Sequence, residues 1–357
     1  MEKPFPVPHS RRRVVAGMLG ALLVPTAATP RSAAIEPAAV DGDLLERARR
    51  EGEVVFVTAA DVLLAQRIAN AFEAKFPGIR VRAERNGSER IFQRLDQEYA
   101  NGIHAVDVVD SADASHFIVW KRRGWLAPYV PEDVALHWPE EERDPDGMFQ
   151  TFRASLSIVG VNTKLVKREE APRSFADLLD PRWRGRLVKA HPGYSGTIVT
   201  TTFLFVRELG WDFLRELAKQ RVMQVQSATE PPKKVAQGER PVMVEGSDYV
   251  LYDLAEKGQP VTPVYPAEGT PLIPVPSGVL AAAPHPNAAR LFQSWLYTEE
   301  GQQMLVDVGN THSMHPKTVD RPGRKPLAEI KLWRADPAQV LEQIEELRRK
   351  HAEIFGT

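Results

Sequence analysis

A strand, a helix and a second strand follow one another from Val54 onward, and this order limits the folds open to the chain. Residues 54–58 are apolar and β-branched, as expected of a buried strand. Apolar residues then recur at four-residue spacing over 64–76, which predicts a helix with one buried face. Pro77-Gly78 ends this helix, and residues 79–83 resume strand character. The segment therefore predicts a β-α-β unit.

The same alternation continues into a second helix and a third strand. Ser88 is placed to cap the helix, and residues 106–109 form the next apolar strand. Strands that alternate with helices predict a parallel sheet covered on both faces, with ligands beyond the carboxyl ends of the strands. We therefore expect an α/β fold whose binding edge includes residues 59–61, 86–88 and 110–113.

The chain begins with the features of an export signal. Ser10 and three arginines precede an apolar run of 11 residues, Val14 to Val24, which is shorter than the roughly 18 residues of a membrane span. The serine and arginines resemble the twin-arginine export motif, and Thr26-Ala27-Ala28 or Ser32-Ala33-Ala34 suits a signal peptidase. We expect residues 1–34 to be a cleaved twin-arginine signal peptide and the mature protein to lie in the periplasm.

Removal of this signal changes the charge balance of the chain. The removed segment holds five basic residues and one acidic residue, so the formal net charge falls from −1 to −5 over the remaining 323 residues. That balance provides no basic surface for a nucleic-acid partner. The chain also has no cysteine, which excludes disulfides, a zinc-thiolate site and a lipoprotein anchor. We expect a free periplasmic protein without a cofactor.

The mature length is close to the size at which one hydrophobic core divides, so two lobes are expected. Residues 156–161 and 272–279 have the character of strands that cross between the lobes. The predicted first lobe contains residues 35–155 and 275–357, and the second contains 156–274. A final amphipathic helix carries apolar residues on one side and is expected to pack on the core; these residues are Val340, Ile344 and Leu347.

Four segments, in this order along most of the mature chain, are similar to one known group of proteins. They are VFVTAADVLLAQRIANAFEAKFPGIRV, SFADLLDPRWRGRLVKAHPGYSGT, QGERPVMVEGSDY and NAARLFQSWLYTEEGQQML. The chain resembles the periplasmic solute-binding proteins of ABC importers, specifically the type 2 group around the ferric-ion-binding proteins. The resemblance implies a two-lobed clamshell with two crossover strands, and a monomeric receptor without enzyme activity. Its partner would be an ABC permease and ATPase complex in the inner membrane.

The chain departs from the ferric binders of this group at two positions. Those proteins present two adjacent tyrosines where this chain has Asp248-Tyr249, and a histidine where it has Ala59-Ala60-Asp61. Ferric iron prefers several anionic oxygen ligands, so a single phenolate is an incomplete set. Other relatives bind hexose phosphates or phosphonates, which favours a small anionic, phosphorylated or phosphonate solute here. A ferric site is the alternative, with Glu89, Asp248, Tyr249 and Tyr252 as its ligands.

A serine-glycine turn at residues 191–197 precedes a predicted apolar helix. The first amides of a helix lack intrahelical partners and carry the positive end of its dipole, so Gly196, Thr197 and the Ser195 hydroxyl can hold a phosphate or carboxylate. Ser195 can equally be an ordinary helix cap. Serines at two other turns can add donors or caps, and two acidic side chains can accept from ligand hydroxyls or an amine. The predicted ligand-binding set is Ser88, Ser111, Tyr194, Ser195, Gly196, Thr197, Asp248, Tyr249 and Glu268.

Two other groups of polar residues suggest different chemistry. His191, Ser195 and Asp180 could form a hydrolase triad, but the chain has no G-x-S-x-G elbow around this serine, so a periplasmic hydrolase is a remote alternative. His312 and His315 have a spacing that metal ligands can use, but no carboxylate stands at a suitable offset. We expect these two histidines to lie in a surface loop.

Overall fold

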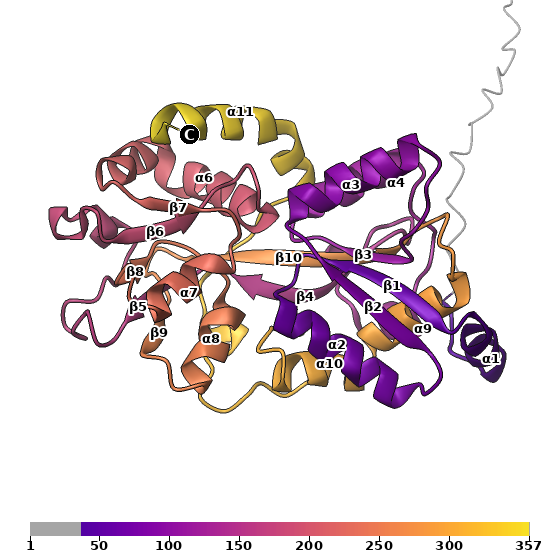
Figure 1. The fold of residues 1–357 in the computed structure, drawn as a ribbon. Helices are drawn as coiled ribbons and strands as arrows, with labels where there is room; N and C mark the ends of the chain where they lie inside the picture. The colour runs from indigo at the N-terminus through magenta and orange to yellow at the C-terminus, as the bar shows by residue number, and fades with distance from the viewer. Residues whose placement is uncertain (1–36, 357) are drawn as a thin grey trace, which may run out of the picture. The chain divides into compact units, whose positions relative to one another are not determined.

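Two β-sheets organise residues 37–356, the part of the chain that the computed structural model describes (Figure 1). The predicted signal peptide and its cleavage site lie outside these residues. The first sheet has the strand order β11-β10-β3-β1-β2, with β4 paired to β10. Its strands are β1 (Glu53–Thr58), β2 (Arg80–Arg85), β3 (Val108–Asp110), β4 (Gln150–Leu156), β10 (Thr270–Val279) and β11 (Leu332–Trp333).

The register of the first sheet confirms the predicted β-α-β unit. Strand β1 pairs in parallel with β2 and with β3. Strand β10 pairs antiparallel with β3 and with β4, so the sheet is mixed at the place where the long strand β10 enters it. The carboxyl ends of β1, β2 and β3 therefore share one edge, as the sequence predicts.

The second sheet has the strand order β7-β6-β8-β5-β9. Its strands are β5 (Val159–Asn162), β6 (Leu187–Ala190), β7 (Met223–Val225), β8 (Val242–Met243) and β9 (Val261–Val264). The crossing strand predicted over 156–161 is two strands, because the chain leaves the first sheet at Ser157. The amide of Ile158 already donates to the carbonyl of Gly246, beside the second sheet (3.1 Å). The second crossing is the connection from β9 to β10.

Eleven helices surround these sheets in the described residues. They are α1 (Gly42–Glu51), α2 (Val62–Lys75), α3 (Ser88–Ala100), α4 (Ala114–Arg122), α5 (Glu132–His137), α6 (Gly196–Lys219), α7 (Glu230–Ala236), α8 (Asp248–Glu256), α9 (Pro286–Tyr297), α10 (Glu299–Asp307) and α11 (Pro337–Phe355). None of these helices combines the length and the apolar character that crossing a membrane requires. The first sheet lies between α3 and α4 on one face and α2, α9 and α10 on the other (Figure 1).

The alternation of side chains along β1 explains this layered packing. Phe56 points to the face covered by α2 and α9, where its ring lies 5.0 Å from that of Phe292. Val57 points to the opposite face and packs with residues of α3 and α4. Both side chains are fully buried, and burial of each contributes roughly 1.5 to 3 kcal/mol. The predicted buried strand and its flanking helices are therefore confirmed.

Helix α11 packs differently from the grouping predicted for residues 275–357. Helices α9 and α10 belong to the apolar cluster of the first sheet, whereas the apolar stripe of α11 joins the cluster around α6 and the second sheet. Val340, Ile344 and Leu347 are buried there, as expected for core positions. Helix α11 packs on the second sheet's cluster because α6 presents an apolar surface there that includes Phe203 and Leu204. The lobe boundaries by residue number remain predictions.

Candidate functional site

Polar side chains from both lobes line a narrow cavity between the two sheets, called here the interlobe cavity. Its first-lobe residues come from the ends of β1 and β2, from the turn before α4, and from β4 and β10; its second-lobe residues come from the turns before α6, α7 and α8. The lining residues are Ala59, Arg85, Gly87, Ser88, Ala112, Arg153, Ser155, Tyr194, Ser195, Thr197, Ser227, Ala228, Thr229, Ser247, Tyr249 and Val275. None of these residues is acidic.

Three helices of more than eight residues begin at this cavity without a side-chain cap. The N-cap residues of α3, α6 and α8 are Gly87, Ser195 and Ser247, and none of them accepts a hydrogen bond from the first turn of its helix through its side chain. By contrast, Asp61 and Asp113 cap α2 and α4 through their carboxylates. Uncapped first-turn amides keep their hydrogen-bonding capacity and carry the positive end of the helix dipole. The cavity therefore has three converging positive helix ends, which favour an anion.

Arg153 is a buried cation that lines the same cavity. Its side chain projects from β4, the residue is 2 % exposed, and its Nε atom has no hydrogen-bond partner. Within the described part of the chain, no carboxylate lies within ion-pair distance of its guanidinium. The guanidinium carbon lies 5.6 Å from the ring centre of Tyr249. A buried guanidinium without an ion pair is costly, so the arrangement is suited to a bound anion.

Asp110 is the acidic residue whose protonation Arg153 influences. Burial raises the pKa of Asp110 and outweighs the Arg153 charge, which acts to lower it. The Asp110 carboxylate accepts hydrogen bonds from the Thr58 hydroxyl (2.6 Å) and the Ala59 amide (2.8 Å). The Asp110 carboxylate is therefore hydrogen-bonded to the end of β1, and it does not neutralise Arg153 through a direct contact.

Arg85 adds a second positive charge and joins the two lobes. Its Nε donates to the carbonyl of Ala60 (3.2 Å), and its terminal nitrogen donates to the Ser227 hydroxyl of the second lobe (2.8 Å). With Arg153, it gives the cavity two guanidinium groups and no carboxylate. Guanidinium groups and helix amides are the donors that bind phosphate and carboxylate most strongly in proteins.

The two lobes approach each other closely at the turn formed by residues 194–196. A Cβ atom on Gly87 would lie 3.1 Å from the carbonyl oxygen of Tyr194, and one on Gly196 would lie 2.5 Å from the amide nitrogen of Asp113. The second distance is too short for any side chain. The free volume of the cavity is only about 20 Å³, little more than a water-sized group. The lobes are thus closed, and a larger ligand requires them to separate.

Tyr249 also contributes to this closure. Its hydroxyl accepts a hydrogen bond from the amide of Asp61 in the first lobe (2.9 Å). The Asp61 carboxylate meanwhile pairs with Lys233 of the second lobe (2.6 Å). Burial raises the pKa of Tyr249 to about 12, although the nearby Arg153 charge opposes the rise. The phenol is therefore neutral at neutral pH. Asp61 makes two contacts between the lobes, one through its amide and one through its carboxylate.

The structure brings together five of the predicted ligand-binding residues. Ser88, Tyr194, Ser195, Thr197 and Tyr249 all line the interlobe cavity. Ser88 does not cap α3 as predicted, because the helix starts one residue earlier and Gly87 is the N-cap.

Two predicted residues lie beside the cavity and do not line it. Ser111 is buried, and its hydroxyl contacts His116 Nδ1 (3.2 Å) and the amide of Asp113 (3.1 Å). Gly196 packs against the backbone of Asp113. Its lack of a side chain thus permits contact between the lobes, a reason different from the predicted approach of an anion.

Asp248 lies in an internal ion network and not among the lining residues. Its carboxylate pairs with Arg324 (2.6 Å) and His312 (3.1 Å) and accepts from the Ser155 hydroxyl (3.0 Å) and the Leu156 amide (2.9 Å). Burial would raise the pKa of Asp248, but Arg324 and His312 outweigh it and lower the pKa to about 2. Its acceptors are thus satisfied within the protein, contrary to the predicted contact with a ligand.

Glu268 and the remaining members of the alternative ferric set are also placed elsewhere. Glu268 accepts from the amide of Ala176 (3.1 Å) in the second lobe. Glu89 forms an ion pair with Arg348 of α11, and the Tyr252 hydroxyl bonds to that of Tyr265 (2.6 Å). Of the four proposed ferric ligands, the interlobe cavity contains Tyr249 alone.

The two histidines expected in a surface loop are buried. His312 is 1 % exposed and His315 is 3 % exposed. Sequence spacing did not reveal this burial, because the partners of the two histidines are distant in the chain: Asp248 faces His312, and Asp133 lies 3.4 Å from His315 Nε2.

For the hydrolase alternative, the carboxylate of Asp180 accepts from the amide of Arg182 (2.9 Å) and caps a short turn.

Arg153 and Arg85 were missed by the sequence analysis. Strand β4 carried a usable signal, since Thr151, Arg153, Ser155 and Ser157 alternate with apolar residues. That period-two pattern indicates a strand with one polar face, and Arg153 and Ser155 of this face line the interlobe cavity.

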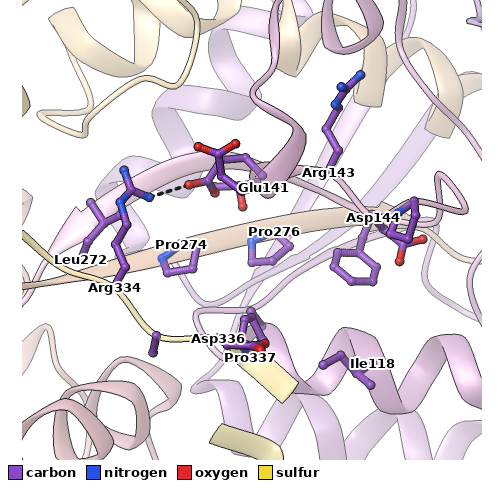
Figure 2. Close-up of a pocket in the computed structure, with 16 residues that line it drawn as sticks. Ile118, Glu141, Arg143, Asp144, Leu272, Pro274, Pro276, Arg334, Asp336 and Pro337 are labelled. Carbon is purple, nitrogen blue, oxygen red and sulfur yellow. Dashed lines mark hydrogen bonds and ion pairs between the residues drawn. The ribbon is translucent and has the colours of Figure 1, made fainter. Parts of the chain in front are cut away.

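A roomier cavity lies beside β10, with a free volume of about 550 Å³ (Figure 2). Its floor is formed by apolar residues such as Leu272, Pro274 and Pro276. Arg334, which is labelled in Figure 2, lines this cavity and pairs with Glu142 at 2.8 Å. The other charged lining residues, Glu141, Arg143, Asp144 and Asp336, are of mixed sign, so its size alone does not make this cavity the functional site.

Comparison with known proteins finds one matching protein family and a related protein of similar sequence. The sequence pattern of one family, described as bacterial extracellular solute-binding protein, matches residues 105–327. Iron uptake protein A1 of Synechocystis is 24% identical over 288 residues, which cover 76% of this chain and 78% of that protein.

Two solved structures show the same fold. The periplasmic binding protein AfuA of Actinobacillus pleuropneumoniae, with fructose-6-phosphate bound, superposes with a TM-score of 0.77 at 23% identity, covering 85% of this chain and 99% of that one. Iron-bound HitA of Pseudomonas aeruginosa has a TM-score of 0.72 at 23% identity, with the same coverage. At this identity the likeness establishes the fold, a two-lobed α/β binding protein of type 2.

Proposed function

Because the chain belongs to the bacterial extracellular solute-binding proteins, we propose that it is the periplasmic receptor of an ABC importer for a small organic phosphate or phosphonate. The observation that carries this proposal is the buried guanidinium of Arg153, which has no ion pair and faces a cavity without acidic residues. The mature protein would release its ligand to a permease and ATPase complex in the inner membrane.

The donors around the cavity suit a phosphoryl group better than a single carboxylate. Arg153 and Arg85 provide charge, three helix ends provide amides, and hydroxyls come from Ser88, Ser195 and Ser227. A phosphoryl group has three terminal oxygens and up to two negative charges, so it can use more of these donors than a carboxylate can. The AfuA structure holds a sugar phosphate in the same fold, which supports this ligand class.

A ferric-iron carrier is the second candidate, favoured by Tyr249 in the cavity and by the similarity to an iron uptake protein. Two observations weigh against it. The pKa of Tyr249 is raised to about 12 by burial, which disfavours the phenolate that ferric iron requires. The adjacent Asp248 is held in a separate ion network by Arg324 and His312.

Native mass spectrometry of the untagged mature protein, purified without refolding, tests the proposal directly. We expect a bound organic phosphate or phosphonate, or binding of fructose 6-phosphate or 2-aminoethylphosphonate in a calorimetric titration. Arg153→Met should weaken that binding at least about tenfold, while Arg82→Met, at an exposed position of β2, should not. A visible band with ferric citrate that disappears in Tyr249→Phe, together with no organic phosphate bound, would overturn the proposal in favour of iron.

A further inference from the structure

Three side chains that do not line the interlobe cavity form a compact group of metal-binding character. Asp133 and His137 occupy positions i and i+4 of α5, so they lie on the same face of that helix. His315 reaches them from the segment that follows α10. One ligand atom from each of the three residues lies within 4.8 Å of the others. Among the described residues, this is the one such group of three His, Asp or Glu side chains.

The packing around this group restrains its most buried member. The side chain of His315 is fully buried, and its ring meets that of His137 edge-on, with the ring centres 4.9 Å apart. Trp138 contacts the same imidazole from another side, at 5.6 Å. The Asp133 carboxylate is about one-third exposed. A cation could therefore enter from the solvent and meet a histidine whose position is already set.

We infer that Asp133, His137 and His315 form a binding site for a divalent transition-metal ion, with Zn²⁺ as the best-suited cation. Two imidazole nitrogens and one carboxylate oxygen are the donors that zinc accepts, and three protein ligands leave its fourth position for water. Nickel and cobalt accept the same donors, whereas magnesium and calcium prefer oxygen. This site is separate from the proposed anion site and does not depend on it.

One hydrogen bond shows what must change when the metal binds. The amide of Lys317 donates to His315 Nδ1 (3.2 Å), so in the metal-free protein Nε2 carries the ring proton and faces Asp133 Oδ1 (3.4 Å). Binding of the metal at Nε2 moves the proton to Nδ1, which can then no longer accept. The Lys317 amide must therefore lose this bond, and the backbone at 316–318 must shift.

Titration of Zn²⁺ into the untagged mature protein, after treatment with a chelator, tests the site. We expect one zinc ion per chain, a rise in melting temperature with zinc, and faster hydrogen exchange at the Lys317 amide. Loss of a group that only supports a metal ligand costs roughly tenfold to a hundredfold in affinity, so loss of one of three direct ligands should weaken binding by about a hundredfold or more. Asp133→Asn, His137→Ala and His315→Ala should each have this effect.

Control variants separate this site from general weak binding. Glu132→Gln, on α5 but exposed, and His104→Ala, an exposed histidine elsewhere, should leave zinc binding unchanged. His315→Ala removes a buried side chain and could unfold the first lobe, so Asp133→Asn is the decisive variant because its side chain is partly exposed. Absence of zinc binding in the parent protein, or equal binding by Asp133→Asn and the parent in a folded state, would overturn the inference.

Discussion

At the scale of single residues, the charge of Arg153 should matter for the ligand and not for the fold. Its guanidinium is buried without an ion pair, so Arg153→Met removes a charge that is costly to bury. We expect the ligand-free melting temperature to stay unchanged or to rise, and anion affinity to fall about tenfold to a hundredfold or more. Calorimetry with the ligand and a thermal melt without it measure the two effects. A lower melting temperature with full affinity would contradict this prediction.

Ser195 allows a test of capping against ligand contact. The serine is the N-cap residue of α6, but its side chain makes no cap hydrogen bond. Ser195→Ala should therefore cost less stability than the roughly 1 kcal/mol of a lost cap, and should weaken ligand binding about tenfold. Asp113, which caps α4 through its carboxylate, offers the matched comparison, since Asp113→Ala should lower the melting temperature. A Ser195→Ala protein that melts lower yet binds normally would mean that the serine only caps the helix.

Asp248 predicts how stability depends on pH. The pKa of Asp248 is lowered to about 2 in the folded protein, against roughly 3.9 in an unfolded chain. Its contribution, on the order of 2 kcal/mol, is therefore complete above about pH 4 and disappears as the pH falls through 2. Denaturant melts of the parent and of Asp248→Asn from pH 6 to pH 2 measure it. The parent should lose more stability than the variant over this range, and parallel curves would contradict the assignment.

The residues of the site show what the sequence could and could not provide. Ser195 was predictable because it stands at a turn before a helix, and Tyr249 was singled out because the resemblance to the ferric binders implies a tyrosine at that position. Arg153 was not recognised, because its charge is visible in the sequence whereas its burial and lack of a partner depend on the packing of β4. Asp248 was assigned to the ligand because the residues that neutralise it, His312 and Arg324, are distant in the chain.

At the scale of elements, the contact between α2 and α7 should favour the closed state. Lys233 of α7 pairs with Asp61, the N-cap of α2, across the lobes. Lys233→Met removes this pair without removing the cap. Because Lys233 is nearly half exposed, the pair contributes only about 0.2 to 1 kcal/mol. We expect ligand release to become a few times faster and less dependent on salt in stopped-flow measurements, while Lys234→Met, which loses a pair within the second lobe, should release at the parent rate.

Elements were predicted well where their pattern is local and poorly where their partner matters. Periodicity identified β1, α2 and β2, because each has a regular apolar face. The pattern of α11 also identified its buried residues, but not which lobe it covers. That choice depends on the apolar surface of α6, with which Val340, Ile344 and Leu347 share a cluster. The break between β4 and β5 was hidden in the same way, because residues 156–161 are mostly apolar and both strands are extended.

At the scale of the whole binding unit, the resemblance in sequence predicted two lobes and a cleft, and the two sheets agree with it. The state of the cleft was not predictable from the sequence. Closure depends on close contacts such as Gly196 against Asp113 and Gly87 against Tyr194, and these join segments that no local pattern connects. A free volume of about 20 Å³ is too small for a sugar phosphate, so binding requires an open form in exchange with the closed one.

We expect the ligand to shift this exchange toward the closed form. An anion that touches Arg153 of the first lobe and the start of α6 in the second gains both contacts only when the lobes are together. Small-angle scattering should therefore show a smaller radius of gyration when the ligand identified by mass spectrometry is added to the ligand-free protein. Arg153→Met, which keeps the fold but lacks the charge, should show no change at the same ligand concentration. An unchanged radius in the parent protein would contradict a clamshell receptor, and an equal decrease in both proteins would mean that the anion is held without Arg153.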